Sequence, residues 1–166
     1  ASIMPDETVE TAEELVGERR LQELIDYVAE DDSMYAEMVG AALAEAPNGF
    51  GSMERAIEES GDMLSARRIR SLEILNVLGA VGPMLGLFGT VYGMIRAFQA
   101  IVTSGSSVKP ADLAAGISTA LVTTFWGLVV GIPAVAGYAL IRNKVDGMAA
   151  EAMVRADELI GQLRPG

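Results

Sequence analysis

The chain has 166 residues and a net charge of −11, because 23 Asp and Glu residues outnumber 12 Lys and Arg residues. Such an acidic chain has no basic footprint for nucleic acid, and 51% hydrophobic residues argue against disorder. The sequence contains no Cys and no His, which excludes disulfides and thiolate sites and removes the commonest metal ligand and general base. We therefore expect neither an enzyme nor a metal or cofactor site.

The net negative charge comes entirely from the first part of the chain. Residues 1–70 hold 17 acidic and 6 basic residues, so we predict an acidic helical region there. Residues 1–9, which include Pro5, are predicted to be an irregular start. Hydrophobic residues at helical spacing then predict one amphipathic helix over 11–30. The acidic surface is interpreted as a solvated face. A site for a cation or for a basic partner is the alternative.

Three signals divide the rest of this acidic region. Ser33 is expected to cap a second helix that continues to about Ala46. The turn-forming residues Pro47–Gly49 then end this helix. From Ser52 onward the helical pattern continues until Gly82–Pro83. The sequence therefore predicts one long helix that runs from the acidic region into the apolar part.

Two long runs without any charged residue follow, Ile74–Ile95 and Leu113–Ile141. As a helix the first run spans about 33 Å, enough to cross a hydrocarbon core of about 30 Å, and the second is long enough to tilt or to project. Both are internal, so neither is a signal peptide. They predict two transmembrane helices, and buried core helices of a soluble protein are the alternative.

These runs predict an all-α integral membrane protein whose transmembrane hairpin extends into the acidic region. Its predicted parts are a long helix over 71–102, a short loop over 103–112, a second span over 113–141 and a C-terminal helix over 142–166. Basic residues flank the spans on one side, which places the acidic region and the C-terminus in the cytoplasm. These flanking residues are Arg67, Arg68, Arg70, Arg142 and Lys144.

Small residues line one face of each span. On the first span they are Gly79, Gly82, Gly86, Gly89 and Gly93, and on the second they include Gly127 and Gly131. Such seams let helices approach closely in lipid. Two seams exceed what one contact within a hairpin needs, so the sequence predicts self-association. Pro83 and Pro133 lie inside the spans and are predicted to kink them, because proline removes a backbone donor.

Four threonines lie at membrane depth and are the candidate ion-pathway residues: Thr90, Thr119, Thr123 and Thr124. Polar side chains in a membrane tend to face a bundle interior or a water path. A Thr hydroxyl that bonds the i−4 carbonyl of its own helix is the alternative. Neither uncharged run contains a titratable relay.

Two stretches carry a resemblance to a known family. Gly82–Phe98 (GPMLGLFGTVYGMIRAF) and Gly116–Tyr138 (GISTALVTTFWGLVVGIPAVAGY) resemble the signature helices of the MotA/TolQ/ExbB proton-channel family, nearest the ExbB/TolQ branch. The resemblance covers residues 67–146. It implies a pentameric ring in the bacterial inner membrane, around two copies of a single-span ExbD/TolR/MotB-type partner. Ion flow then drives that partner, in support of transport, envelope or motility work. Thr90 and Thr124 are implied to face the pore, near the partner's essential Asp.

The chain departs from the family pattern in two places. Thr119 occupies a position that commonly holds Glu in ExbB/TolQ proteins, which leaves open whether the ion is a proton or sodium. This departure also keeps open a non-conducting scaffold of the same fold that anchors a partner. The family has one further membrane helix before its cytoplasmic region, and nothing in residues 1–70 fits it. We expect that N-terminal transmembrane helix to be absent from this chain.

Overall fold

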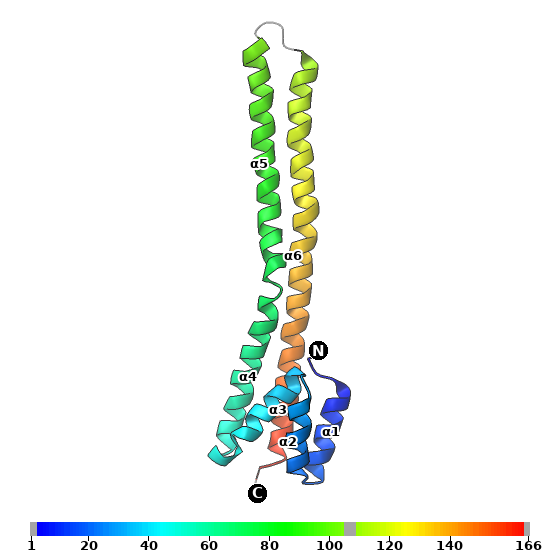
Figure 1. Ribbon diagram of the computed structural model, residues 1–166, viewed down its shortest axis with the longest axis vertical. Coiled ribbons are helices and arrows are strands. Elements are labelled where there is room, and N and C mark those ends of the chain that lie inside the picture. Colours follow the sequence, from blue (N-terminus) through cyan, green and yellow to red (C-terminus); the bar gives the residue numbers. More distant parts are fainter. Residues whose placement is uncertain (1–2, 105–108, 165–166) are drawn as a thin grey trace. The chain divides into compact units, whose positions relative to one another are not determined.

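The computed structural model describes residues 3–104 and 109–164, and all regular structure in these ranges is helical (Figure 1). Two compact units divide the chain: unit 1 covers 1–71 with 142–166, and unit 2 covers 72–141. The predicted all-helical class is confirmed. The elements are α1 (Asp6–Gly17), α2 (Leu21–Glu30), α3 (Met34–Ala44), the short 3-10 helix η1 (Ala46–Asn48), α4 (Phe50–Arg70), α5 (Glu73–Ser104) and α6 (Pro110–Gly161).

A turn separates α1 from α2, so the single helix predicted over 11–30 is wrong. Arg19 adopts a left-handed conformation with φ of 58°. Arg20 N donates to Leu15 O over 2.9 Å, and Arg19 N donates to Val16 O over 3.0 Å. This pair of hydrogen bonds closes a helix end of the Schellman type. The hydrophobic spacing continues through the turn, and for that reason periodicity alone did not reveal it. The predicted irregular start is also too long, since α1 begins within it.

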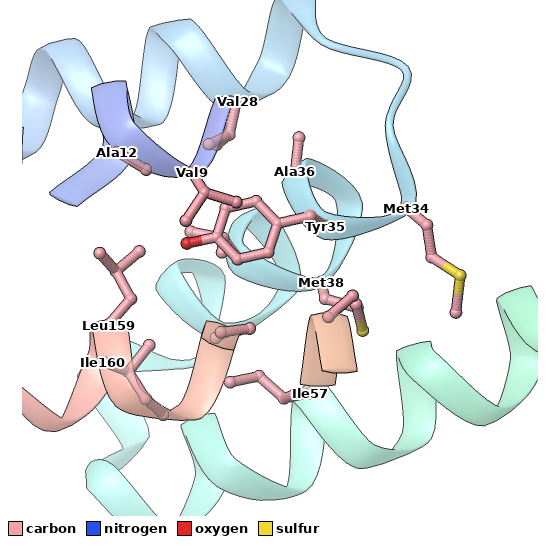
Figure 2. Packing of buried hydrophobic residues seen from close by; sticks show 14 of the residues in the cluster. Val9, Ala12, Val28, Met34, Tyr35, Ala36, Met38, Ile57, Leu159 and Ile160 are labelled. Carbon is pink, nitrogen blue, oxygen red and sulfur yellow. The ribbon is translucent and has the colours of Figure 1, made fainter. Parts of the chain in front are cut away.

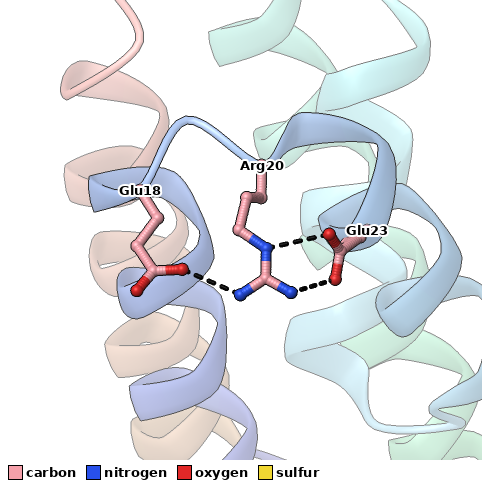
Figure 3. Close-up of polar contacts among 3 residues, drawn as sticks. All are labelled: Glu18, Arg20 and Glu23. Atoms are coloured by element: carbon pink, nitrogen blue, oxygen red, sulfur yellow. Dashed lines mark hydrogen bonds and ion pairs between the residues drawn. The ribbon is translucent and has the colours of Figure 1, made fainter.

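The Arg20 side chain bridges the two ends of this turn (Figure 3). Its Nη1 donates to Glu18 Oε2 over 2.8 Å, its Nε donates to Glu23 Oε1 over 2.8 Å, and its Nη2 contacts the second Glu23 oxygen. The hydrogen bonds from Arg20 lower the pKa of Glu23. All three side chains are solvent-exposed. We therefore expect these contacts to fix the shape of the turn and to contribute little to the free energy of unfolding.

Replacing Arg19 by Gly is expected to slow hydrogen exchange of the α1 and α2 amides in the full chain. Glycine adopts a positive φ without the steric cost of a Cβ atom, and the expected gain is about 0.5–1 kcal/mol. Gly49 has a φ of 97°, so Gly49→Ala is a matched control that should speed exchange in the helices flanking it. Unchanged or faster exchange in the Arg19→Gly chain contradicts this account.

A second turn, at residues 71–72, separates α4 from α5. Ser71 Oγ donates to Arg68 O over 2.6 Å, and Ser71 N donates to the same oxygen over 3.3 Å. The uninterrupted helix predicted from Ser52 into the first span is therefore wrong. Serine can bond nearby carbonyls of its own chain and so compete with the helix, a signal that hydrophobic spacing does not contain.

The core of unit 1 gathers around α3 (Figure 2). Ser33 caps this helix as predicted, since its Oγ accepts a hydrogen bond from Ala36 N over 3.2 Å. Tyr35 of α3 is fully buried, and Leu159 and Ile160 of α6 belong to the same hydrophobic cluster. The C-terminal part of α6, which the sequence predicts as a helix over 142–166, thus shares one core with the acidic region.

The Tyr35 hydroxyl is buried without a hydrogen-bond partner among the described residues. Burial is the main cause that raises the pKa of Tyr35. An unsatisfied buried polar group costs about 1–3 kcal/mol, so Tyr35→Phe is expected to raise the thermal unfolding temperature of the full chain in detergent. Tyr27→Phe is the control at a partly exposed site and should have little effect. A clear loss of stability in Tyr35→Phe would show that the hydroxyl has a partner.

Unit 2 consists of α5 and the first part of α6, up to residue 141. Both helices are long and apolar enough to cross a membrane. Only 11% of the most apolar 18-residue stretch of each helix is buried. Phe88 is 71% exposed and Trp126 is 60% exposed. The core helix of a soluble protein would be mostly buried, so this exposure favours membrane spans. Pro83 and Pro133 lie within helices assigned without interruption, and the kinks stay predictions.

The two long helices extend into both ends of the loop predicted over 103–112. Helix α5 continues to Ser104 and α6 begins at Pro110. Residues 105–108 lie outside the described part of the chain.

Candidate ion pathway

Helices α5 and α6 pack through their glycines. A Cβ atom added at Gly127 would lie 2.7 Å from Gly82 O and 2.9 Å from Gly86 Cα. One added at Gly93 would lie 2.8 Å from Gly116 O. Backbone atoms thus occupy the space that larger side chains would need, and only glycine permits this approach.

The remaining glycines of the two seams take part in the same contact. Gly79 lies against Val135, Gly89 against Thr123, and Gly131 against the Pro83 ring. Both seams are therefore used inside one hairpin. Two seams therefore do not exceed what one contact within the hairpin needs, and self-association does not follow from them.

Thr90 of α5 and Thr124 of α6 meet in this contact. Their Oγ1 atoms are hydrogen-bonded to each other. Each hydroxyl also lies within reach of Gly86 O, over 3.1 Å from Thr90 and 3.2 Å from Thr124. Ala120 O is 3.4 Å from Thr90 Oγ1 and 3.3 Å from Thr124 Oγ1. Four oxygen atoms from two helices are thereby gathered in one partly buried place.

Chemically, this four-oxygen cluster has more acceptors than protons. A hydroxyl has one proton to donate and two lone pairs, so each Thr can bond only one of its acceptors at a time. The proton of either hydroxyl can turn from one oxygen to another without being left unpaired. Such a cluster can relay a proton from one oxygen to the next. Oxygen atoms are also the ligands that hard cations prefer.

Thr119 is not part of this cluster, but Thr123 bonds to one of its oxygens. Thr123 Oγ1 donates to Ala120 O over 2.9 Å. Thr119 is exposed and its Oγ1 donates to Ala115 O over 2.9 Å, the i−4 bond of its own helix. Of the four predicted residues, Thr90 and Thr124 bond to each other, and Thr123 shares their acceptor Ala120 O.

Thr119 instead lines an open polar pocket of about 580 Å³ at the loop end of the hairpin. Arg96 and Asp112, at the outer ends of the spans, line the same pocket, and Arg96 Nη1 donates to Tyr92 OH over 3.4 Å. Tyr92 and Gln99 also line it and were not among the predicted site residues. Their helical spacing from Arg96, at i−4 and i+3, is the signal that could have found them.

Residues 29–153 match the family described as the MotA/TolQ/ExbB proton channel family, and this range contains both signature stretches. The chain belongs to the MotA/TolQ/ExbB family. The resemblance carried by those stretches is therefore confirmed, and the two exposed apolar helices are those of a membrane protein of this family.

Curated relatives include both ExbB and TolQ proteins, which confirms the ExbB/TolQ branch. Biopolymer transport protein exbB1 of Vibrio cholerae is 39% identical over 80 residues, which cover 48% of this chain and 35% of that protein. Tol-Pal system protein TolQ of Pseudomonas aeruginosa is 34% identical over 107 residues, covering 64% and 44%. Biopolymer transport protein ExbB of Salmonella typhimurium is 32% identical over 127 residues, covering 71% and 52%. The chain spans roughly a third to a half of these relatives, and none of these names denotes an enzyme.

Proposed function

We propose that this chain is an ExbB/TolQ-like subunit of an ion-driven motor in the bacterial inner membrane. The observation that carries the proposal is the Thr90–Thr124 hydroxyl pair between α5 and α6, in a chain of a proton channel family. Five copies form a ring around two copies of a single-span ExbD/TolR-type partner. The partner provides the carboxylate that this chain lacks in its uncharged runs.

In the proposed mechanism the threonine oxygens deliver the ion to that carboxylate. The hydroxyl protons of Thr90 and Thr124 reorient among Gly86 O and Ala120 O as the ion passes. Neutralising the partner's Asp removes the cost of holding a charge in an apolar ring, so the partner changes which subunit it prefers. The gradient contributes about 2.3 kcal/mol per charge per 100 mV, which drives the step.

The basic residues set the proposed orientation. Arg67, Arg68 and Arg70 precede the first span, and Arg142 and Lys144 follow the second, so both flanks are cytoplasmic. The polar pocket around Thr119 then opens to the other side of the membrane. In this arrangement the ion enters through the pocket, and the hydroxyls gathered around Ala120 O lie about one helical turn further along α6.

Flux through reconstituted vesicles tests the proposal. Vesicles that hold the full chain with its single-span partner should show partner-dependent flux when a proton or sodium gradient is imposed, read by a pH-sensitive or sodium-sensitive dye. Vesicles with the chain alone are the control. Absence of gradient-dependent flux from the complete assembly favours the alternative function, a scaffold of the same fold that anchors its partner without passing ions.

A further inference from the structure

An open groove of about 430 Å³ lies between α2 and α3 of unit 1, whereas the hydroxyl pair belongs to unit 2. Its lining is apolar along the two helices, with Val28 and Ala36 buried and Leu43 partly buried. Ile25 lines the groove and is 42% exposed. An apolar partner side chain seated here would remove both its own surface and that of Ile25 from water, at about 25 cal/mol per Å².

The groove is open at the level of Gly40. A Cβ atom added there would meet only Val28 Cγ2, at 3.7 Å, within 4 Å. A glycine and the neighbouring alanines of α3 therefore leave room for a bulky side chain from outside. The interior of unit 1 does not fill this space.

Three carboxylates stand at one end of the groove: Asp31, Asp32 and Glu37. Burial alone would raise the pKa of Asp31, but hydrogen bonds from Thr8 Oγ1 (2.6 Å) and Ser33 N (2.8 Å) outweigh it and lower that pKa, so this group is ionised at neutral pH. Asp32 and Glu37 are exposed and have no cationic partner within residues 3–104 and 109–164.

We propose that this groove docks a cationic amphipathic segment of another protein, in which Lys or Arg residues flank one or two large apolar side chains. The carboxylates would pair with the cations while the apolar floor takes the apolar side chains. A second copy of this chain is a poor occupant, because its acidic residues 1–70 would bring like charges to the rim. The proposal thus takes up the basic-partner alternative for the acidic surface and gives it a specific docking place.

The test uses the full chain in nanodiscs of zwitterionic lipid and a labelled helical peptide built only of Leu and Lys. Binding is read from the Ile25 methyl resonance and from fluorescence anisotropy, with binding to empty nanodiscs subtracted. The Leu–Lys peptide should shift the Ile25 signal, and its affinity should fall as salt rises. A Leu–Glu peptide of the same pattern and a Lys-only peptide should bind much more weakly.

Charge variants locate the site. Asp32→Lys with Glu37→Lys should weaken binding by about tenfold or more, and both positions are exposed, so folding should be kept. Glu10→Lys with Glu14→Lys makes the same change of charge on α1 and should leave most of the affinity. Equal loss in both pairs would show attraction to bulk charge. That result, an unmoved Ile25 signal, or equal binding of the Leu–Glu or Lys-only peptide overturns the proposal.

Discussion

Thr90→Val and Thr124→Val are each expected to reduce energised activity of the assembled complex by about tenfold, the equivalent of about 1.4 kcal/mol in the activation barrier. Valine has nearly the shape of threonine but no hydroxyl, so the helix contact is kept while one of four clustered oxygens is lost. The double variant should be little worse than either single one, because residues that act as a unit are not additive. Activity is measured in cells that depend on the complex, with the amount of assembled complex quantified alongside.

Two variants serve as controls for this prediction. Thr90→Ser keeps the hydroxyl and should keep most of the activity. Thr11→Val removes a hydroxyl that donates to Glu7 O of its own helix, in α1 of unit 1, so it should behave like the parent chain. Full activity in Thr90→Val and Thr124→Val would exclude the hydroxyl pair from the ion path.

Gly127→Ala is expected to force α5 and α6 apart. The new Cβ atom would meet Gly82 O, Gly86 Cα and Gly86 N at 2.7, 2.9 and 3.1 Å, and all three are backbone atoms that cannot rotate away. Overpacking of this kind costs about 1–3 kcal/mol. Spin labels on cysteines introduced into α5 and α6 of this Cys-free chain should report a longer distance between the helices in the variant.

Gly137→Ala is the matched control for this change. It lies in the same helix and unit, but a Cβ atom there meets nothing within 4 Å. Since alanine favours helix over glycine by about 1 kcal/mol, this variant should be neutral or stabilising. If Gly127→Ala leaves the interhelical distance and the stability of the chain unchanged, the close contact of the two seams is wrong.

The membrane spans and the main candidate residues follow from local features of the sequence. An uncharged run is visible without any knowledge of the fold, and Ile74–Ile95 and Leu113–Ile141 mark the apolar parts of α5 and α6. Thr90 and Thr124 stand out because hydroxyls are few among so many apolar side chains. Residue type placed them among four candidate threonines, and the resemblance to the family singled out this pair.

What the sequence did not predict depends on tertiary contacts and on the backbone. The turn at Arg19 places a residue other than glycine in the left-handed conformation, and hydrophobic spacing continues through it. The spacing of the glycines shows that one face of each helix lacks side chains, but not which neighbour packs against that face. The pairing of the two seams with each other could therefore not be deduced. The contact of Leu159 and Ile160 with the α3 core joins residues more than a hundred positions apart.

Proton or sodium flux driven by an imposed gradient tests the central claim most directly, compared in vesicles between the parent chain and the Thr90→Val/Thr124→Val double variant, each assembled with the single-span partner. We expect flux in the parent assembly and a reduction of about tenfold or more in the double variant, with Thr11→Val unchanged and all three assemblies present in equal amounts. Equal flux in the parent and the double variant would contradict it.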